Sequence, residues 1–191
     1  MSQQEYGYAI ELYMDPALEN QVLKAWNALA RRQISTHLID MESRPHITLF
    51  SFPSSSSSSL DPSKFDSILE TFASKQDPLP LSFSAIGSLS GDSNLLFLSP
   101  TPTLSLLHLH SHLSDALRKE GIDVPADYSV DNWIPHCSVA KHVPKARMAE
   151  GFSVLRDLKL PVTGYAVDIA LVEFSPVREL FSFVLGTSAG S

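Results

Sequence analysis

Two short segments of this chain share one pattern: a proline, a histidine, an apolar residue, a hydroxyl residue and a second apolar residue. They occupy residues 45–49 and 135–139. Their histidines, His46 and His136, lie 90 positions apart in a chain of 191 residues. A pattern repeated at half-chain separation predicts two similar halves, each carrying one segment in an equivalent place.

Each segment is expected to form a β-strand, in which successive side chains point to opposite faces. His46 and Thr48 then share one face of the first strand, and His136 and Ser138 share one face of the second. Two imidazoles that titrate near neutral pH, together with two hydroxyl donors, are sufficient for general acid–base chemistry on a phosphate ester. We therefore expect these four residues to be catalytic. The alternative is a pair of structural strand histidines that bond to the backbone.

The remaining sequence predicts alternating strands and helices from its period-2 and helical patterns. Strands are expected at residues 6–13, 45–52, 79–89, 94–99, 134–142, 165–174 and 180–185, and helices at 16–33, from 61 onward, from 104 to near 121 and at 144–155. The serine run 54–59 is expected to be a flexible loop near the mouth of the site. This order predicts an α+β fold of two similar lobes related by a pseudo-twofold axis, which would bring the two histidine strands together.

Composition narrows the classes of partner. The formal net charge of −7 disfavours long duplex nucleic acid, whose binding needs many lysine and arginine contacts to phosphate. A phosphate carried by a small molecule or by an RNA end is the expected ligand. No apolar run reaches the ~20 residues of a membrane span, and the N-terminus lacks a signal-peptide pattern. We expect a cytoplasmic protein, with the nucleus also open to it, and a monomer, because one chain supplies both halves of the site.

A metal or another cofactor is not expected. The single cysteine, Cys137, allows neither an intramolecular disulfide nor a cysteine-based zinc site. As a strand neighbour of His136 it points to the opposite face, so a Cys–His dyad is excluded and a core position is expected. His108, His110 and His112 lack the residues of a known metal pattern, and we expect them to face solvent.

The two motifs resemble those of the 2H phosphoesterase superfamily, also called the 2′-5′ RNA ligase-like or cyclic phosphodiesterase family. Its members carry two His-x-Thr/Ser motifs, each on a central strand of one lobe, as in residues 46–48 and 136–138 here. Residues 8–12 are similar to the family's opening strand. Residues 94–98, with the leucine-rich helix after them, are similar to the start of its second lobe. The resemblance covers nearly the whole chain.

This resemblance implies one domain over residues 1–191, with lobes at roughly 1–90 and 91–191 between which strands are exchanged. It also implies antiparallel sheets that line a central cleft, with helices outside. The family often has arginine five residues after the second histidine, where this chain has Lys141. Lysine keeps the charge and loses the two-pronged guanidinium.

The implied activity is hydrolysis of a 2′,3′-cyclic phosphate without a metal. One neutral histidine takes a proton from water, and the other, protonated, gives one to the leaving ribose oxygen. Thr48 and Ser138 stabilise the non-bridging oxygens, and Lys141 adds positive charge. The sequence does not assign base and acid to the two histidines. Four aromatic residues near the motifs are candidates to stack on a base, the first two because strand alternation places them on the face of His46: Phe50, Phe52, Tyr128 and Trp133.

Two other functions remain open at this point. One is a 3′ exonuclease that trims RNA with the same motifs, and the other is a nucleotide-binding module without turnover. RNA ligation is the least expected role, because the chain has no nucleotide-activating lysine motif. Cyclic nucleotides, ADP-ribose cyclic phosphate and RNA ends with a cyclic phosphate are the candidate substrates.

Overall fold

The structure is a computed structural model, and it describes residues 6–53, 60–89, 91, 93–174 and 176–186. Its strands are β1 (Gly7–Met14), β2 (Ile47–Pro53), β3 (Leu79–Leu89), β4 (Leu95–Pro100), β5 (Cys137–Ala140), β6 (Val162–Phe174) and β7 (Arg178–Val184). Its helices are α1 (Pro16–Arg31), α2 (His37–Asp40), α4 (Ser63–Lys75), α5 (Leu104–Lys119) and α6 (Met148–Arg156), with 3₁₀ turns η1 (Ala126–Tyr128) and η2 (Lys145–Arg147).

The strands form one open antiparallel sheet in the order β2-β1-β6-β3-β4-β5, with β7 also paired to β6. Strand β6 is the centre of this sheet. β1 runs along one side of it, while β3 and then β7 follow each other along its other side. The histidine strands β2 and β5 lie at the two ends of the pairing order, and they nevertheless contact each other. The sheet is therefore curved enough to bring its two ends together.

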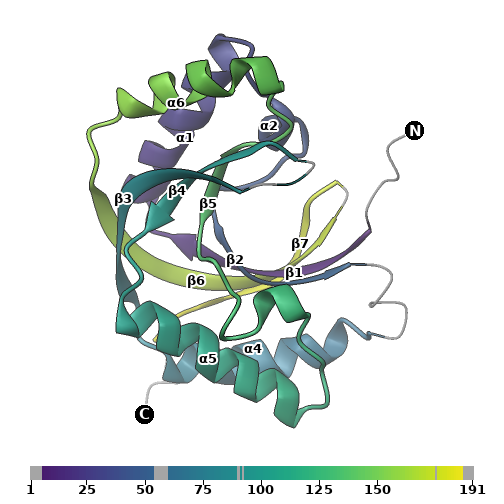
Figure 1. The fold of residues 1–191 in the computed structure, drawn as a ribbon. Helices are drawn as coiled ribbons and strands as arrows, with labels where there is room; N and C mark the ends of the chain where they lie inside the picture. The colour runs from purple at the N-terminus through teal and green to yellow at the C-terminus, as the bar shows by residue number, and fades with distance from the viewer. Residues whose placement is uncertain (1–5, 54–59, 90, 92, 175, 187–191) are drawn as a thin grey trace.

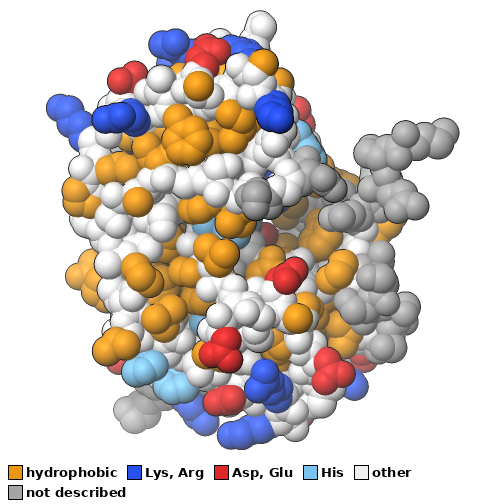
Figure 2. Space-filling view, viewed as in Figure 1, with side chains coloured by type: hydrophobic (Ala, Val, Ile, Leu, Met, Phe, Trp, Pro, Cys, Tyr) orange, Lys and Arg blue, Asp and Glu red, His pale blue; other side chains and the backbone are white. Residues whose placement is uncertain are grey.

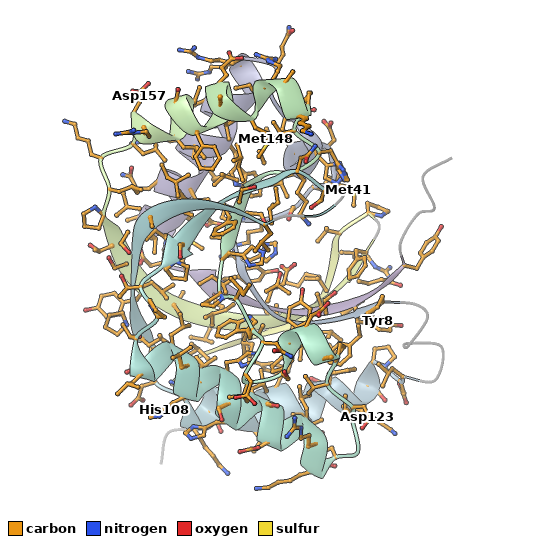
Figure 3. All side chains as sticks on the ribbon, viewed as in Figure 1. Tyr8, Met41, His108, Asp123, Met148 and Asp157 are labelled. Carbon is orange, nitrogen blue, oxygen red and sulfur yellow. The ribbon has the colours of Figure 1, made fainter. Side chains whose placement is uncertain are left out.

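Helices cover the outer faces of the curved sheet in two groups, with α1, α2 and α6 on one side and α4 and α5 on the other (Figure 1). Side chains fill the space between each helical group and the strands (Figure 3). The units β1–α1–β2 and β4–α5–β5 repeat the same order in the two halves. The expected α+β architecture, an antiparallel sheet with helices outside, is confirmed.

The start of α1 shows how local sequence sets an element. Asp15 accepts hydrogen bonds from the backbone N–H groups of Ala17 (3.0 Å) and Leu18 (3.1 Å), as an N-cap residue does, and Pro16 occupies the first helical position. The second carboxylate oxygen of Asp15 accepts from the N–H of Tyr165 in β6 at 2.7 Å. The cap therefore also joins α1 to the central strand.

Several boundaries differ from the expected ones. β5 is shorter than the strand expected at 134–142, the helix expected at 144–155 begins as η2 before continuing as α6, and the single turn α2 is unexpected. The serine run 54–59 lies outside the described residues. Among the helices in the described part of the chain, none combines the length and the apolar character that a bilayer crossing requires.

Candidate active site

A β-bulge follows each histidine motif. In β2, Thr48 pairs with Glu11 and Phe50 with Ile10, so Leu49 has no partner in β1. In β5, Ser138 pairs with Phe97 and Ala140 with Leu96, so Val139 is the unpaired residue. The extra residue reverses the alternation of side chains beyond it. His46 and His136 each come directly before the first residue of the strand, and together with the hydroxyl residue before the bulge they lie on the inner face of the sheet. Figure 2 shows the molecule hollowed between its two helical groups, where this inner face lies.

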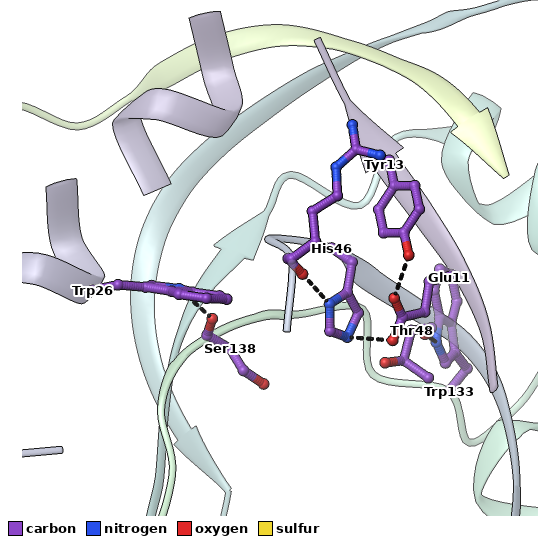
Figure 4. A network of polar contacts seen from close by, with 8 residues as sticks. Glu11, Tyr13, Trp26, His46, Thr48, Trp133 and Ser138 are labelled. Atoms are coloured by element: carbon purple, nitrogen blue, oxygen red, sulfur yellow. Dashed lines mark hydrogen bonds and ion pairs between the residues drawn. The ribbon is translucent and has the colours of Figure 1, made fainter. Parts of the chain in front are cut away.

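His46 is held by contacts at both ring nitrogens (Figure 4). Nδ1 lies 2.6 Å from the backbone carbonyl of Arg44, which can only accept, so Nδ1 carries a proton. Nε2 lies 3.3 Å from a carboxylate oxygen of Glu11, whose side chain is only 5 % exposed. The other carboxylate oxygen accepts a hydrogen bond from the Tyr13 hydroxyl at 2.9 Å. Burial and the neighbouring Glu11 raise the pKa of Tyr13, so its hydroxyl remains a donor.

His136 has the same backbone contact and different neighbours. Its Nδ1 lies 2.7 Å from the carbonyl of Ile134, and its ring lies 5.2 Å from the Phe97 ring, measured between centroids. Burial lowers the pKa of His136, and the charges of His46 and Lys141 lower it further. Strands β2 and β5 contact each other, so the two imidazoles lie near each other although they belong to opposite ends of the sheet. The structure thus brings the two predicted pairs together.

Two tryptophans bond to the backbone of the hydroxyl residues. Trp26 of α1 donates from Nε1 to the carbonyl of Ser138, and Trp133 donates from Nε1 to the carbonyl of Thr48, both at 3.1 Å. Each indole reaches a motif of the other half of the chain. These bonds fix the two motif strands against elements far away in the sequence.

His110 supports the first bulge from behind. Its Nε2 lies 3.1 Å from the carbonyl of Leu49, the bulged residue. Its ring is stacked between the rings of Trp133 (3.9 Å, 3° between planes) and Phe50 (4.6 Å, 11°). Only 1 % of His110 is exposed, and burial lowers its pKa to about 4. The prediction that this histidine faces solvent is therefore wrong, because α5 turns it toward the sheet.

The predicted stacking residues are corrected in the same way. Phe50 and Phe52 are 0 % and 1 % exposed, since the bulge at Leu49 turns both toward the helices. Phe52 packs on Phe65 of α4, with ring centroids 5.4 Å apart. Trp133 is 9 % exposed and has one ring face covered by His110. These three aromatic residues build the support beneath the motif, where no base can reach Phe50 or Phe52.

The bulges also explain which later residues join the inner face. Ser51 and Lys141 each lie five positions after a histidine, an odd spacing that an unbroken strand would place on the opposite face. In β2 the extra residue returns Ser51 to the side of the histidine, whereas Lys141 follows the last residue of β5, just beyond the second bulge. The side chain of Ser51 hydrogen-bonds to that of Tyr128, and the charge of Lys141 acts on His136. Tyr128 and Lys141 therefore stay in the candidate site.

The other predicted core and surface residues are placed as follows. Cys137 is fully buried, and burial raises the pKa of its thiol to about 12, which suits a packing residue. His108 is exposed and points away from the sheet (Figure 3), with its ring 5.9 Å from that of His112. No cluster of three or more histidine, cysteine or acidic side chains suited to a metal ion occurs within the described ranges.

The sequence reasoning missed Glu11, Tyr13, Phe97 and Ser51 as members of the site. Glu11 had a detectable signal, because it is the single charged residue in the otherwise apolar and aromatic stretch 6–14. A buried charge requires a partner, and an isolated one in a strand therefore marks a special position. Tyr13 lies two positions after Glu11 and so shares its strand face, whereas Phe97 and Ser51 join the site through strand pairing and a bulge, which the sequence pattern does not show.

Comparisons with known proteins agree with this geometry. A family model described as the 2′-5′ RNA ligase superfamily matches residues 15–177. A comparison with curated protein sequences gives no match.

Solved structures share the fold over nearly the whole chain. The protein TT0787 of Thermus thermophilus superposes with a TM-score of 0.65 at 12 % identity, covering 94 % of this chain and 98 % of that one. E. coli LigT in its apo form gives 0.61 at 12 % identity, with coverage of 96 % and 99 %. LigT complexed with 3′-AMP gives 0.57 at 12 % identity over the same shares. At such identities the likeness concerns the fold.

Proposed function

The chain belongs to the 2′-5′ RNA ligase superfamily, and on that basis we propose that it hydrolyses 2′,3′-cyclic phosphates by general acid–base catalysis between His46 and His136. One observation carries the proposal. Two histidine–hydroxyl pairs from opposite ends of the sheet meet on its inner face, where β2 contacts β5.

The chemistry follows from the groups present. Water attacks phosphorus while a neutral imidazole removes its proton, and the bond from phosphorus to one ribose oxygen breaks as the second, protonated imidazole supplies a proton to that oxygen. Thr48 and Ser138 donate hydrogen bonds to the non-bridging oxygens, where negative charge develops. Lys141 adds positive charge beside His136. No step in this scheme needs a metal.

The substrate class is a nucleotide-like cyclic phosphate: a nucleoside 2′,3′-cyclic monophosphate, ADP-ribose cyclic phosphate or an RNA end. E. coli LigT, a structural relative, has been solved with 3′-AMP, NADP+ and ATP, which supports a nucleotide ligand. Tyr128 is the proposed contact for the base, because it lies on the inner face beside Ser51. We propose that the enzyme is a monomer, because both histidines come from one chain. We also propose that it is cytoplasmic.

The test is turnover of 2′,3′-cyclic AMP in excess EDTA, with products resolved by chromatography. His46→Ala and His136→Ala should each lower kcat by about 10² to 10⁴, the usual contribution of a general acid or base. His108→Ala is the matched control, since it removes an exposed imidazole from α5. We expect the control to retain wild-type kcat.

The other outcomes are informative. Full activity in either catalytic variant would contradict the proposal. Nucleotide binding without turnover by the wild type would replace it with a binding module. Removal of nucleotides from an RNA 3′ end, without opening of any cyclic phosphate, would favour the exonuclease.

A further inference from the structure

The two motif strands pair with β1 and β4 in equivalent ways, and the residue opposite the motif hydroxyl differs in chemical type between them. Across from Thr48, at the first bulge, stands Glu11 of β1. Across from Ser138, at the second bulge, stands Phe97 of β4. Residues paired across antiparallel strands point to the same face, so both side chains lie beside a motif histidine. The two imidazoles therefore have opposite surroundings, a buried carboxylate for one and an aromatic ring for the other.

The contacts at His46 suit its charged form. Nδ1 donates to the carbonyl of Arg44, so a neutral ring would direct the lone pair of Nε2 at the carboxylate of Glu11, 3.3 Å away. An imidazolium directs an N–H there instead and gains the attraction of opposite charges in a poorly solvated place. The Tyr13 hydroxyl donates a hydrogen bond to the other carboxylate oxygen of Glu11 at 2.9 Å and stabilises the charged carboxylate.

The contacts at His136 suit its neutral form. Nδ1 carries the proton shared with the carbonyl of Ile134, which leaves a lone pair on Nε2. The neighbour at the position equivalent to Glu11 is the Phe97 ring, which offers no negative charge. Burial and the nearby charges of His46 and Lys141 lower the pKa of His136.

Other charged groups around the pair come from several elements. Arg44 lies over the Tyr13 ring, 4.1 Å from its centroid, and bonds to Glu19 of α1 at 2.7 Å. Asp168 of β6 and Glu179 of β7 act electrostatically on Arg44 or Tyr13. Burial raises the pKa of Asp168, and Arg44 opposes that rise. Among these groups, Glu11 is the one whose carboxylate faces the His46 imidazole directly.

We propose that Glu11 is a positioning residue that keeps His46 protonated as the general acid and thereby leaves His136 as the general base. The inference rests on the proposed function. His136 Nε2 takes a proton from water as the new phosphorus–oxygen bond forms. His46 Nε2 gives its proton to the ribose oxygen as the old bond breaks. Solvent then removes the proton from His136, and Glu11 favours reprotonation of His46.

The distance between His46 and Glu11 fits this role. Charge-assisted N–H···O bonds usually measure about 2.7 to 2.9 Å, whereas this contact measures 3.3 Å. The contact is an ion pair longer than such a bond, so the Nε2–H of the imidazolium can still donate to the leaving oxygen of a bound substrate.

The first experiment reads charge without turnover. Long-range ¹H–¹⁵N spectra of the full chain distinguish imidazolium from neutral imidazole, and His46→Gln and His136→Gln assign the two signals among seven histidines. At pH 7 we expect His46 to be charged and His136 to be neutral with its proton on Nδ1. In Glu11→Gln, His46 should become neutral. Glu19→Gln, which removes a nearby carboxylate from Arg44, should leave His46 charged.

The second experiment reads kcat for 2′,3′-cyclic AMP against pH. Glu11→Gln should lower kcat about 10- to 100-fold at pH 7 and move the alkaline limb to lower pH, while Glu11→Asp should restore part of both. A neutral His46 in the wild type, or an unchanged His46 signal in Glu11→Gln, would overturn the role of Glu11. Correct spectra without turnover of any cyclic phosphate would instead refute the proposed function, so the two failures are distinguishable.

Discussion

His110 illustrates how burial between aromatic rings changes a histidine. The ring is buried between Trp133 and Phe50, which disfavours its charged form, and the bond to the carbonyl of Leu49 opposes that effect only in part. Burial lowers its pKa from 6.5 to about 4 in the folded protein. Between these values the unfolded chain binds a proton that the folded protein does not. The free energy of unfolding therefore falls as the pH falls from 6.5 toward 4.

We expect this single group to account for about 3 kcal/mol of lost stability at pH 4, from the shift of its pKa. His110→Gln retains an N–H donor and cannot titrate. Urea unfolding from pH 7.5 to 4.5 should give a free energy that falls less steeply for His110→Gln than for the wild type. Other titrating groups are common to both proteins and cancel in the difference. Parallel curves would show that His110 does not cause the acid loss.

The histidine strands depend on bonds that come from other elements. A bulge interrupts the hydrogen-bond ladder beside each motif. The indole N–H of Trp26 in α1 donates to the carbonyl of Ser138, and that of Trp133, ahead of β5, donates to the carbonyl of Thr48. Each bond crosses more than 80 positions of sequence. The hydroxyl residues are thus oriented by tertiary contacts in addition to strand pairing.

Trp133→Phe should destabilise the protein by about 1 to 3 kcal/mol, because it leaves the carbonyl of Thr48 without its donor while keeping most of the ring packing. Trp26→Phe should do the same for Ser138. Far-ultraviolet circular dichroism in urea is the suitable probe, since the chain has two tryptophans and each variant loses one fluorophore. Tyr165→Phe, at an exposed ring of β6, is the control. Unchanged urea midpoints of unfolding in both tryptophan variants would show that these indole hydrogen bonds do not stabilise the motif strands.

The whole molecule is organised around β6. β3, from the first half of the chain, pairs with β4 and β6, whereas β6, from the second half, also pairs with β1. Helix α1 packs on β5 and β6, so the first half also covers strands of the second. Each half thereby depends on the other for pairing partners and for burial of its core.

We propose on this ground that residues 1–191 form a single domain. The fragments 1–90 and 91–191 should each lack a cooperative unfolding transition when expressed alone, because the first loses β6, which joins β1 to β3, and the second loses β3, which joins β4 to β6. Thermal circular dichroism and amide NMR dispersion measure this. A cooperative transition in either fragment would show two independent lobes, and the full chain serves as the folded reference.

The sequence was sufficient for the fold class and for most of the strands and helices, because these rest on short-range patterns. Alternation, helical spacing and the Asp15-Pro16 cap act within a few residues and hold in the structure. The predicted strand face of Phe50 and Phe52 is wrong, because one unpaired residue, Leu49, reverses the alternation of side chains after Thr48. Unbroken alternation was the wrong assumption at that point, and a bulge depends on the register with β1.

The difference in role that we propose for the two histidines depends on residues outside the motifs. His46 and His136 have matching neighbours in sequence, each with a proline before it and a hydroxyl residue two positions later. Their surroundings differ because strands β1 and β4 place Glu11 beside one and Phe97 beside the other. Charge and burial act through space, across contacts between distant segments. The chain therefore carries its proposed catalytic groups in a local pattern, while the different surroundings of the two histidines arise from the folded sheet.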